Sequence, residues 1–216
     1  MKKIISTVLI FVIIFSLFSC SEKDREYDEG EVILAAKELI EASKLLNYVY
    51  WGEGIGYIED ENTANGYYYQ ADFTSLKNLG FRTVDELKEL TRATFSTTFS
   101  EYVFETKLSS VSDEDGVHSL ARYYQKYYDK EMTEPDTIMV YSRAIILLSD
   151  EVEYDYDSIT VEGSKGQVVY IKINATVKRE EKEQTRSLKI GLIEEESGWR
   201  LNDATYLVYD EELEEK

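Results

Sequence analysis

The fold is decided by the stretch YDSITVEGSKGQVVYIKINATVKRE, residues 156–180. Its turn-forming residues, Gly-Ser-Lys-Gly at 163–166, separate two arms in which apolar and polar side chains alternate. A period of two is typical of a strand with one buried face, and a glycine-containing turn between two such arms is typical of a β-hairpin. The sequence therefore predicts a long antiparallel hairpin, and the buried face of its second arm consists of Val169, Ile171, Ile173, Ala175 and Val177.

The segments on either side of this hairpin also have the character of strands. In QTRSLKIGLIEE, residues 184–195, the alternation is repeated, and a turn at Ser197-Gly198 leads to a last strand. The residues expected to point inward are Leu188, Ile190, Leu192, Trp199 and Leu201. Upstream, the apolar run TIMVYSRAIILL, residues 137–148, follows Pro135, the only proline of the chain. The C-terminal half is therefore predicted to be an antiparallel meander.

The N-terminal half begins with the period of an α-helix. Between residues 32 and 51, apolar side chains recur at intervals of three and four, which predicts an amphipathic helix that ends at Trp51-Gly52. The members of this apolar stripe are Val32, Ala35, Ala36, Leu39, Ala42, Leu46 and Val49. Several glycines follow, so we expect an irregular loop and then a short strand from about Tyr67 to Phe73.

Further helices are predicted in the middle of the chain. Thr83 and Glu86 have the spacing of a capping box, which indicates the start of a helix. Ser100 is the expected N-cap of a second, short helix. A third helix is predicted over 117–128, although its second part, ARYYQKYY at 121–128, also fits a strand.

Helices followed by antiparallel strands are typical of an α+β fold. We expect the N-terminal helices to pack on one face of a single twisted antiparallel sheet. Residues 32–209 are predicted to form one domain and residues 210–216 an acidic tail. Cys20 is the only cysteine, so the burial of side chains, and not a disulfide, has to stabilise this domain.

The N-terminus has the features of an export signal with a lipid attachment site. A basic start, Met1-Lys2-Lys3, precedes an apolar run from Ile4 to Phe18 that is shorter than the ~20 residues needed to span a bilayer. The segment Leu17-Phe18-Ser19-Cys20 resembles the lipobox of bacterial lipoproteins. The resemblance implies that a signal peptide, 1–19, is removed and that Cys20 is acylated. Residues 20–31 would then form a polar tether to the cell membrane or outer membrane, on the side facing away from the cytoplasm.

The composition restricts the partners that this chain can have. Its formal net charge is −19, so it repels nucleic acid and is expected to prefer a protein partner with a basic surface. Its hydrophobic content of 43% is high enough for a folded core. We therefore expect a folded domain that binds no nucleic acid.

The sequence contains no recognisable catalytic group. His118 is the only histidine, so a zinc site with several histidines is excluded. A cysteine–histidine pair is excluded as well, because Cys20 is the only cysteine and is expected to carry the lipid. His118 is expected on the surface of a helix. Carboxylates are too numerous for any one pair to stand out. We therefore predict no enzymatic activity, no metal and no cofactor.

The aromatic residues provide the candidate binding residues. Tyrosine combines a flat apolar ring with a polar tip, which suits sugar stacking and protein interfaces. The predicted binding residues are Tyr67, Tyr68, Tyr69 and Trp51. Other tyrosine clusters are Tyr123, Tyr124, Tyr127 and Tyr128, and Tyr154 with Tyr156. Packing at the edge of the core is the alternative explanation for all of these clusters.

Three segments carry a resemblance to a known family. They are YWG at 50–52, FRTVDELKELTRATFS at 81–96 and GWRLNDATY at 198–206. Together with the order of helices and strands, they resemble the cone-shaped, cystatin-like fold of the nuclear transport factor superfamily. Within it, residues 32–206 are similar to the IseA family of DL-endopeptidase inhibitors. The resemblance implies a protein that binds a cell-wall hydrolase and blocks its active-site cleft.

Two functions from different classes remain open at this point. The first is an envelope-anchored binding domain that engages a basic protein, such as the cell-wall hydrolase that the resemblance implies. The second is a pocket between helices and sheet, lined by tyrosines and Trp51, that holds a small ligand or a glycan fragment, with or without hydrolysis. An accessory lipoprotein with a structural role is a third possibility.

Overall fold

The computed structural model describes residues 26–62, 64–113, 116–127, 137–146, 151–179 and 181–210, and for 111–113 and 116–119 it describes the backbone alone. The predicted signal peptide, the predicted lipidation site Cys20 and residues 211–216 of the predicted tail lie outside these ranges.

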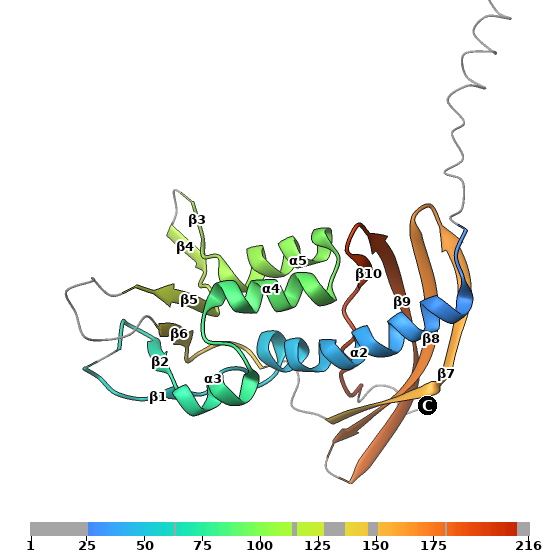
Figure 1. The fold of residues 1–216 in the computed structure, drawn as a ribbon. Coiled ribbons are helices and arrows are strands. Elements are labelled where there is room, and N and C mark those ends of the chain that lie inside the picture. The colour runs from blue at the N-terminus through green and yellow to red at the C-terminus, as the bar shows by residue number, and fades with distance from the viewer. Residues whose placement is uncertain are drawn as a thin grey trace, which may run out of the picture.

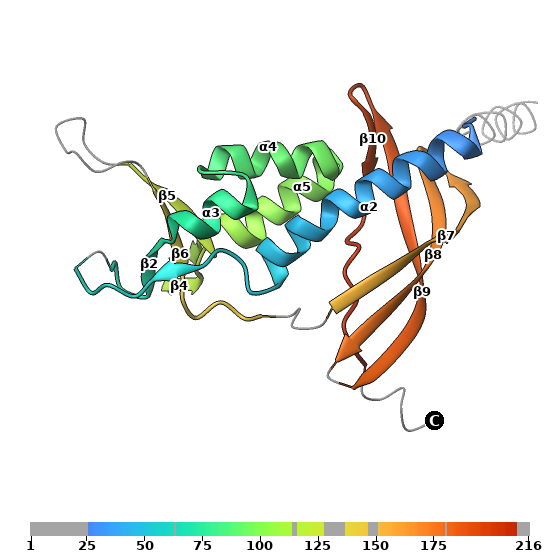
Figure 2. The ribbon, with the colours of Figure 1, turned by 60° about the horizontal axis from the view of Figure 1, so that its bottom comes forward.

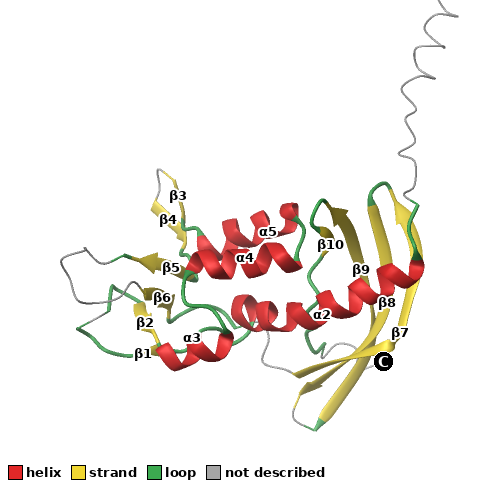
Figure 3. Ribbon diagram, in the orientation of Figure 1, coloured by secondary structure: helices red, strands yellow, loops and turns green. Residues whose placement is uncertain are grey.

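The fold is α+β, with helices between two antiparallel sheets (Figures 1 and 3). The helices are α2 (Glu29–Trp51), α3 (Phe73–Leu79), α4 (Val84–Thr94), α5 (Thr97–Val103) and the π-helix η1 (Phe104–Leu108). The first sheet has the order β1-β2-β6-β5, with β1 (Tyr57–Ile58), β2 (Tyr68–Ala71), β6 (Thr137–Tyr141) and β5 (Tyr123–Lys126). The second sheet has the order β10-β9-β8-β7, with β10 (Gly198–Leu201), β9 (Lys182–Glu195), β8 (Val168–Arg179) and β7 (Glu151–Lys165). Strands β3 (Val111–Asp113) and β4 (Gly116–Ser119) form a separate hairpin.

The second sheet contains the predicted hairpin. Strands β7 and β8 pair antiparallel, and all five residues expected on the inner face of β8 are buried. The prediction of the turn was wrong in position, because β7 continues to Lys165 and the chain reverses at Gly166-Gln167. Gly163 lies inside β7 instead, next to a shift in the pairing register, and its φ of 125° is a conformation that favours glycine.

Helix α2 follows the prediction but starts earlier. The Asp28 side chain accepts a hydrogen bond from the Glu31 backbone N–H at 2.9 Å, so Asp28 is the N-cap. The helix therefore begins at Glu29, within the expected tether, and not at Val32. In Figures 1 and 2 the helix starts at the second sheet and runs towards the first. Its buried side chains belong to one core with residues of both sheets, including Val140 and Ile171.

Two polar side chains, Tyr123 at the start of β5 and Arg122 just before it, close the C-terminal end of α2. The buried Arg122 guanidinium donates hydrogen bonds to the carbonyl oxygens of Tyr50 at 2.8 Å and Gly52 at 2.6 Å, and to the Tyr123 hydroxyl at 2.8 Å. Tyr123 in turn donates to the carbonyl oxygen of Val49 at 2.7 Å. A positive charge at this end complements the helix dipole and pairs the carbonyl groups that a helix leaves free.

Several predictions for the middle of the chain were wrong. The expected helix over 117–128 is replaced by β4 and β5, so the alternative of a strand was right for the second part, and His118 lies in a strand. The segment is extended because Tyr123 is fully buried opposite Val140 of β6. The single expected sheet is two sheets, because β6 pairs with β2 and β5 and not with β7. Helix α3 was not predicted.

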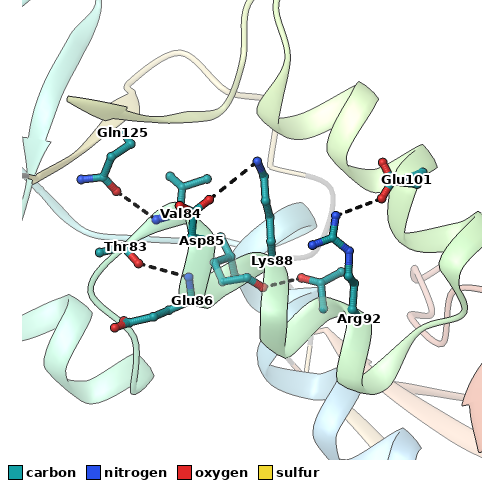
Figure 4. A network of polar contacts seen from close by, with 10 residues as sticks. Thr83, Val84, Asp85, Glu86, Lys88, Arg92, Glu101 and Gln125 are labelled. Carbon is teal, nitrogen blue, oxygen red and sulfur yellow. Dashed lines mark hydrogen bonds and ion pairs between the residues drawn. The ribbon is translucent and has the colours of Figure 1, made fainter. Parts of the chain in front are cut away.

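The caps of α4 and α5 refine the predicted helix starts. Thr83 accepts from the Glu86 N–H at 3.1 Å as expected (Figure 4). The Glu86 side chain, however, accepts from the N–H of Arg82 and not of Thr83. Gln125 of β5 also accepts from the first N–H of α4, at Val84. Helix α5 is capped by Ser96. The predicted cap, Ser100, is instead a buried residue inside that helix.

Candidate functional site

A pocket of about 170 Å³ lies between α2, the start of β7 and the segment that follows β10. Helix α2 and its C-cap contribute Lys44, Asn47, Tyr48 and Gly52, strand β7 contributes Val152 and Tyr154, and the last segment contributes Tyr206. Three of these seven lining residues are tyrosines, so aromatic rings form a substantial part of the wall. We call this site the tyrosine pocket.

A chain of buried hydrogen bonds holds the Asn47 side chain in the tyrosine pocket. The Ser43 hydroxyl donates to the Ile40 carbonyl oxygen at 2.7 Å, so the 2.6 Å contact between Ser43 and Thr205 uses the proton of Thr205. Thr205 Oγ1 therefore accepts from Asn47 Nδ2, at 2.8 Å. This order of donors fixes the orientation of the Asn47 amide.

The carbonyl oxygen of the same amide has no partner. Asn47 is only 5% exposed, and its Oδ1 makes no hydrogen bond within the described part of the chain. A buried acceptor without a donor costs about 1–3 kcal/mol. Asn47 Oδ1 is itself buried, so it is an unsatisfied acceptor of the interior and not a group that is exposed to a ligand.

One wall of the tyrosine pocket is stiffened by an ion pair and two aromatic rings. Lys44 Nζ lies 2.5 Å from a carboxylate oxygen of Glu41, and this oxygen also accepts from the Tyr156 hydroxyl at 2.6 Å. The Lys44 ammonium lies 5.6 Å from the ring centre of Tyr154 and 5.5 Å from that of Tyr156. The hydrogen bond from Lys44 and then that from Tyr156 lower the pKa of Glu41, so this carboxylate stays ionised.

Of the three tyrosines that line the pocket, Tyr154 and Tyr206 are held by contacts with residues outside the pocket, and Tyr48 is partly exposed. The Tyr154 hydroxyl donates to the Thr205 carbonyl oxygen at 2.7 Å, and burial raises the pKa of Tyr154 to about 12. The Tyr206 ring packs on the buried Trp51 with 5.0 Å between ring centres. Tyr48 is 43% exposed and forms part of the rim. The rings of Tyr154 and Tyr206 thus present firmly held faces.

The predicted binding residues do not meet in this pocket. Trp51 is buried and supports Tyr206 from behind. Tyr68 and Tyr69 lie on β2 in the first sheet, where Tyr68 donates to the Ala121 carbonyl oxygen at 2.6 Å and Tyr69 stacks on a neighbouring tyrosine. Tyr67 precedes β2 and is 48% exposed. Tyr68 and Tyr69 are thus half-buried in the first sheet, and Tyr67 is the exposed member of this cluster.

Sequence reasoning missed the residues that build the pocket. Lys44, Asn47 and Tyr206 were not singled out, and Tyr154 was noted only as a member of a cluster. One signal was available: Ser43 and Asn47 continue the apolar stripe of the first helix at intervals of four and three residues, so two polar side chains had to be buried. Polar residues on the apolar face of a helix need partners, and here they find Thr205.

The described residues show no arrangement typical of a metal centre, since no three histidine, cysteine or acidic side chains are grouped there. Within the same ranges, no helix combines the length and the apolar character needed to cross a bilayer. The sequence matches no protein-family model and no curated protein.

Proposed function

We propose that this protein is a lipid-anchored binding protein of the cell envelope whose tyrosine pocket holds one ring of a neutral glycan and does no chemistry on it. The observation that carries the proposal is the combination of tyrosine walls with the Lys44 ammonium, a hydrogen-bond donor on a side chain that is 39% exposed. Ligand sites are typically apolar hollows with a few polar groups that fix orientation, and this pocket has that composition.

The size of the pocket favours a single six-membered ring. A protein cavity of about 150 Å³ accommodates benzene, and the tyrosine pocket measures about 170 Å³. The faces of tyrosine rings suit the apolar face of a sugar ring, whose hydroxyl oxygens can accept a hydrogen bond from Lys44. A longer glycan would extend past the exposed Tyr48 at the rim.

The residues that line the pocket favour binding over catalysis. None of those described is a carboxylate, a histidine or a serine. The neighbouring carboxylate, Glu41, is already bound to Lys44 and Tyr156, and its lowered pKa makes it a poor general acid. The proposal therefore includes no hydrolysis.

The test is a titration of the full-length protein in detergent with two neutral oligosaccharides, cellotetraose and chitotetraose, followed by NMR. We expect saturable shifts of signals from α2 and β7 with at least one sugar. Tyr48→Ala should weaken that binding, whereas Tyr102→Ala should not, since Tyr102 is an exposed tyrosine of α5. Absence of binding by both sugars, or equal effects of the two substitutions, would refute the proposal.

The anchor is tested separately. Cys20→Ala should move the protein from the membrane fraction to the soluble fraction of the cells that produce it, because a lipid anchor requires the thiol. Persistent membrane attachment of this variant would contradict the lipoprotein assignment, while leaving the pocket unaffected.

A second candidate function is inhibition or modulation of a basic cell-wall hydrolase, and the net charge of −19 is the observation that favours it. The protein should then capture a basic envelope protein in a complex that dissociates with salt. A complex insensitive to salt would argue against this function.

We also propose the cystatin-like cone as the finer fold description, supported by the course of α2 relative to the curved second sheet (Figure 2).

A further inference from the structure

The end of the described chain, residues 207–210, lies on the second sheet but belongs to no strand. We call this segment the C-terminal strap. Two side chains of β9 bind its backbone. The Gln184 amide donates to the Asp210 carbonyl oxygen at 3.1 Å and accepts from the Asp210 N–H at 3.2 Å. Arg186 donates to the Val208 carbonyl oxygen. Hydrogen bonds to the backbone do not depend on the side chains of the bound segment, so the same two residues would hold any extended peptide.

The side chains of the C-terminal strap alternate between the sheet and the solvent. Leu207 and Tyr209 are each 6% exposed, whereas Val208 between them is 38% exposed. The two buried side chains form a cluster with the buried Ala175 and Val177 of β8. A peptide in an extended conformation that carries apolar side chains at two alternate positions therefore matches this face of the sheet.

The cluster beneath the C-terminal strap is separate from the main core. The side chains that pack against both clusters are Tyr154 and Leu188, and both are only partly buried. Just before the strap, Thr205 is fixed to α2 by buried hydrogen bonds to two side chains of that helix. A hollow of about 470 Å³ borders residues 206–210, so there is open space beside the strap. Departure of the strap would therefore leave the main core and Thr205 in place.

We propose that the surface beneath the C-terminal strap is a docking groove for an extended peptide segment of a partner protein, and that the strap closes this groove in the free protein. The groove consists of Ala175 and Val177 of β8 and of their register partners on β9, Arg186 and Gln184, which share one face of the sheet. The partner segment carries two apolar side chains at alternate positions, as Leu207 and Tyr209 do. The groove is a different site from the tyrosine pocket, and the two are measured with different ligands.

The test uses the full-length protein in detergent and a fluorescently labelled peptide with the sequence of residues 203–210, DATYLVYD. A tethered segment acts at an effective concentration of about a millimolar, so the strap should exclude the peptide from the wild-type protein. The double variant Leu207→Ser, Tyr209→Ser should open the groove and bind the peptide at least about tenfold more tightly, as measured by fluorescence anisotropy. A peptide with serine at the same two positions should bind to this variant at least about tenfold more weakly. Val208→Ser is the matched control, since Val208 is exposed within the same strap, and it should behave like the wild-type protein.

Four results would overturn the docking groove. The first is a double variant that keeps the circular dichroism spectrum of the wild-type protein but binds no peptide. The second is a double variant that loses its fold, since the strap would then be part of the core and not a detachable segment. The third is equal binding of the peptide by the wild-type protein, which would mean that the strap does not close the groove. The fourth is a wild-type dimer, detected by light scattering, that the double variant does not form, because a second copy of this chain would then be the occupant.

Discussion

Replacement of Arg122 by methionine tests whether one buried guanidinium stabilises the C-terminal end of α2. Methionine keeps most of the length of the side chain but has no donor. The substitution would leave the carbonyl oxygens of Tyr50 and Gly52 without the hydrogen bonds that Arg122 supplies at 2.8 and 2.6 Å, and it would remove the bond to Tyr123. The α2 helix would also lose the positive charge that complements its dipole.

The magnitude follows from these contacts. Each buried carbonyl oxygen left unpaired costs roughly 2 kcal/mol, which gives about 4 kcal/mol for the two. Removing a buried charge relieves part of its desolvation, which offsets some of this loss. We therefore expect the free energy of unfolding to fall by about 3 kcal/mol, a large part of the 5–15 kcal/mol that is usual for a domain.

The assay is urea unfolding followed by circular dichroism and by tyrosine fluorescence. Arg143→Met is the control, because Arg143 also lies over a tyrosine ring, that of Tyr67 at 3.6 Å, but is exposed. Its substitution should change the stability by less than about 1 kcal/mol. Arg122→Lys should fall between the two, since an ammonium lacks the fork of the guanidinium. A loss of less than 1 kcal/mol in Arg122→Met would refute this account of the helix end.

Three further predictions concern stability. Gly54→Ala should lower the free energy of unfolding in urea by more than 2 kcal/mol, because φ is 80° and the new Cβ would lie 2.6 Å from Arg122 Nη2. The control is Gly66→Ala, where φ is 62° but the space around the new Cβ is open, so the loss should be about 1 kcal/mol. Thr83→Ala should cost about 1 kcal/mol by the same measurement, because the N-cap of α4 is lost; no change would mean that Gln125 alone fixes this end. Burial raises the pKa of Tyr154 in the folded protein to about 12, above its ordinary value of about 10. The stability that neutral Tyr154 contributes is therefore complete below about pH 10 and is lost as the pH rises from about 10 to 12. Tyrosinate absorbance and circular dichroism should therefore change together there, and ionisation of all tyrosines near pH 10 in a folded protein would contradict this.

Much of the architecture was predictable because its signals are local. The stripe from Val32 to Val49 predicted α2, Thr83 predicted the cap of α4, and the alternation in residues 169–177 predicted the buried face of β8. In each case the period or the cap is set by neighbours in sequence. Such patterns persist in the folded protein because tertiary packing uses the same faces.

What was missed depends on partners that are distant in sequence. The segment around Tyr123 has apolar residues at helical spacing, yet it is a strand because Val140 of β6 and the end of α2 provide its partners. The tyrosine pocket depends on Thr205, which lies far along the chain from Ser43 and Asn47. A pattern of residue types cannot reveal which remote side chain completes a hydrogen bond.

The attachment of α2 at both of its ends has a consequence for how the protein unfolds. The helix is about 35 Å long at 1.5 Å per residue. It packs in one core with residues of the second sheet, while Tyr123 of the first sheet and the adjacent Arg122 hold its last turn. Neither sheet can separate from the helix without exposing that shared core. The two sheets are therefore expected to lose their structure in one cooperative transition, with the long helix as the mechanical link between them.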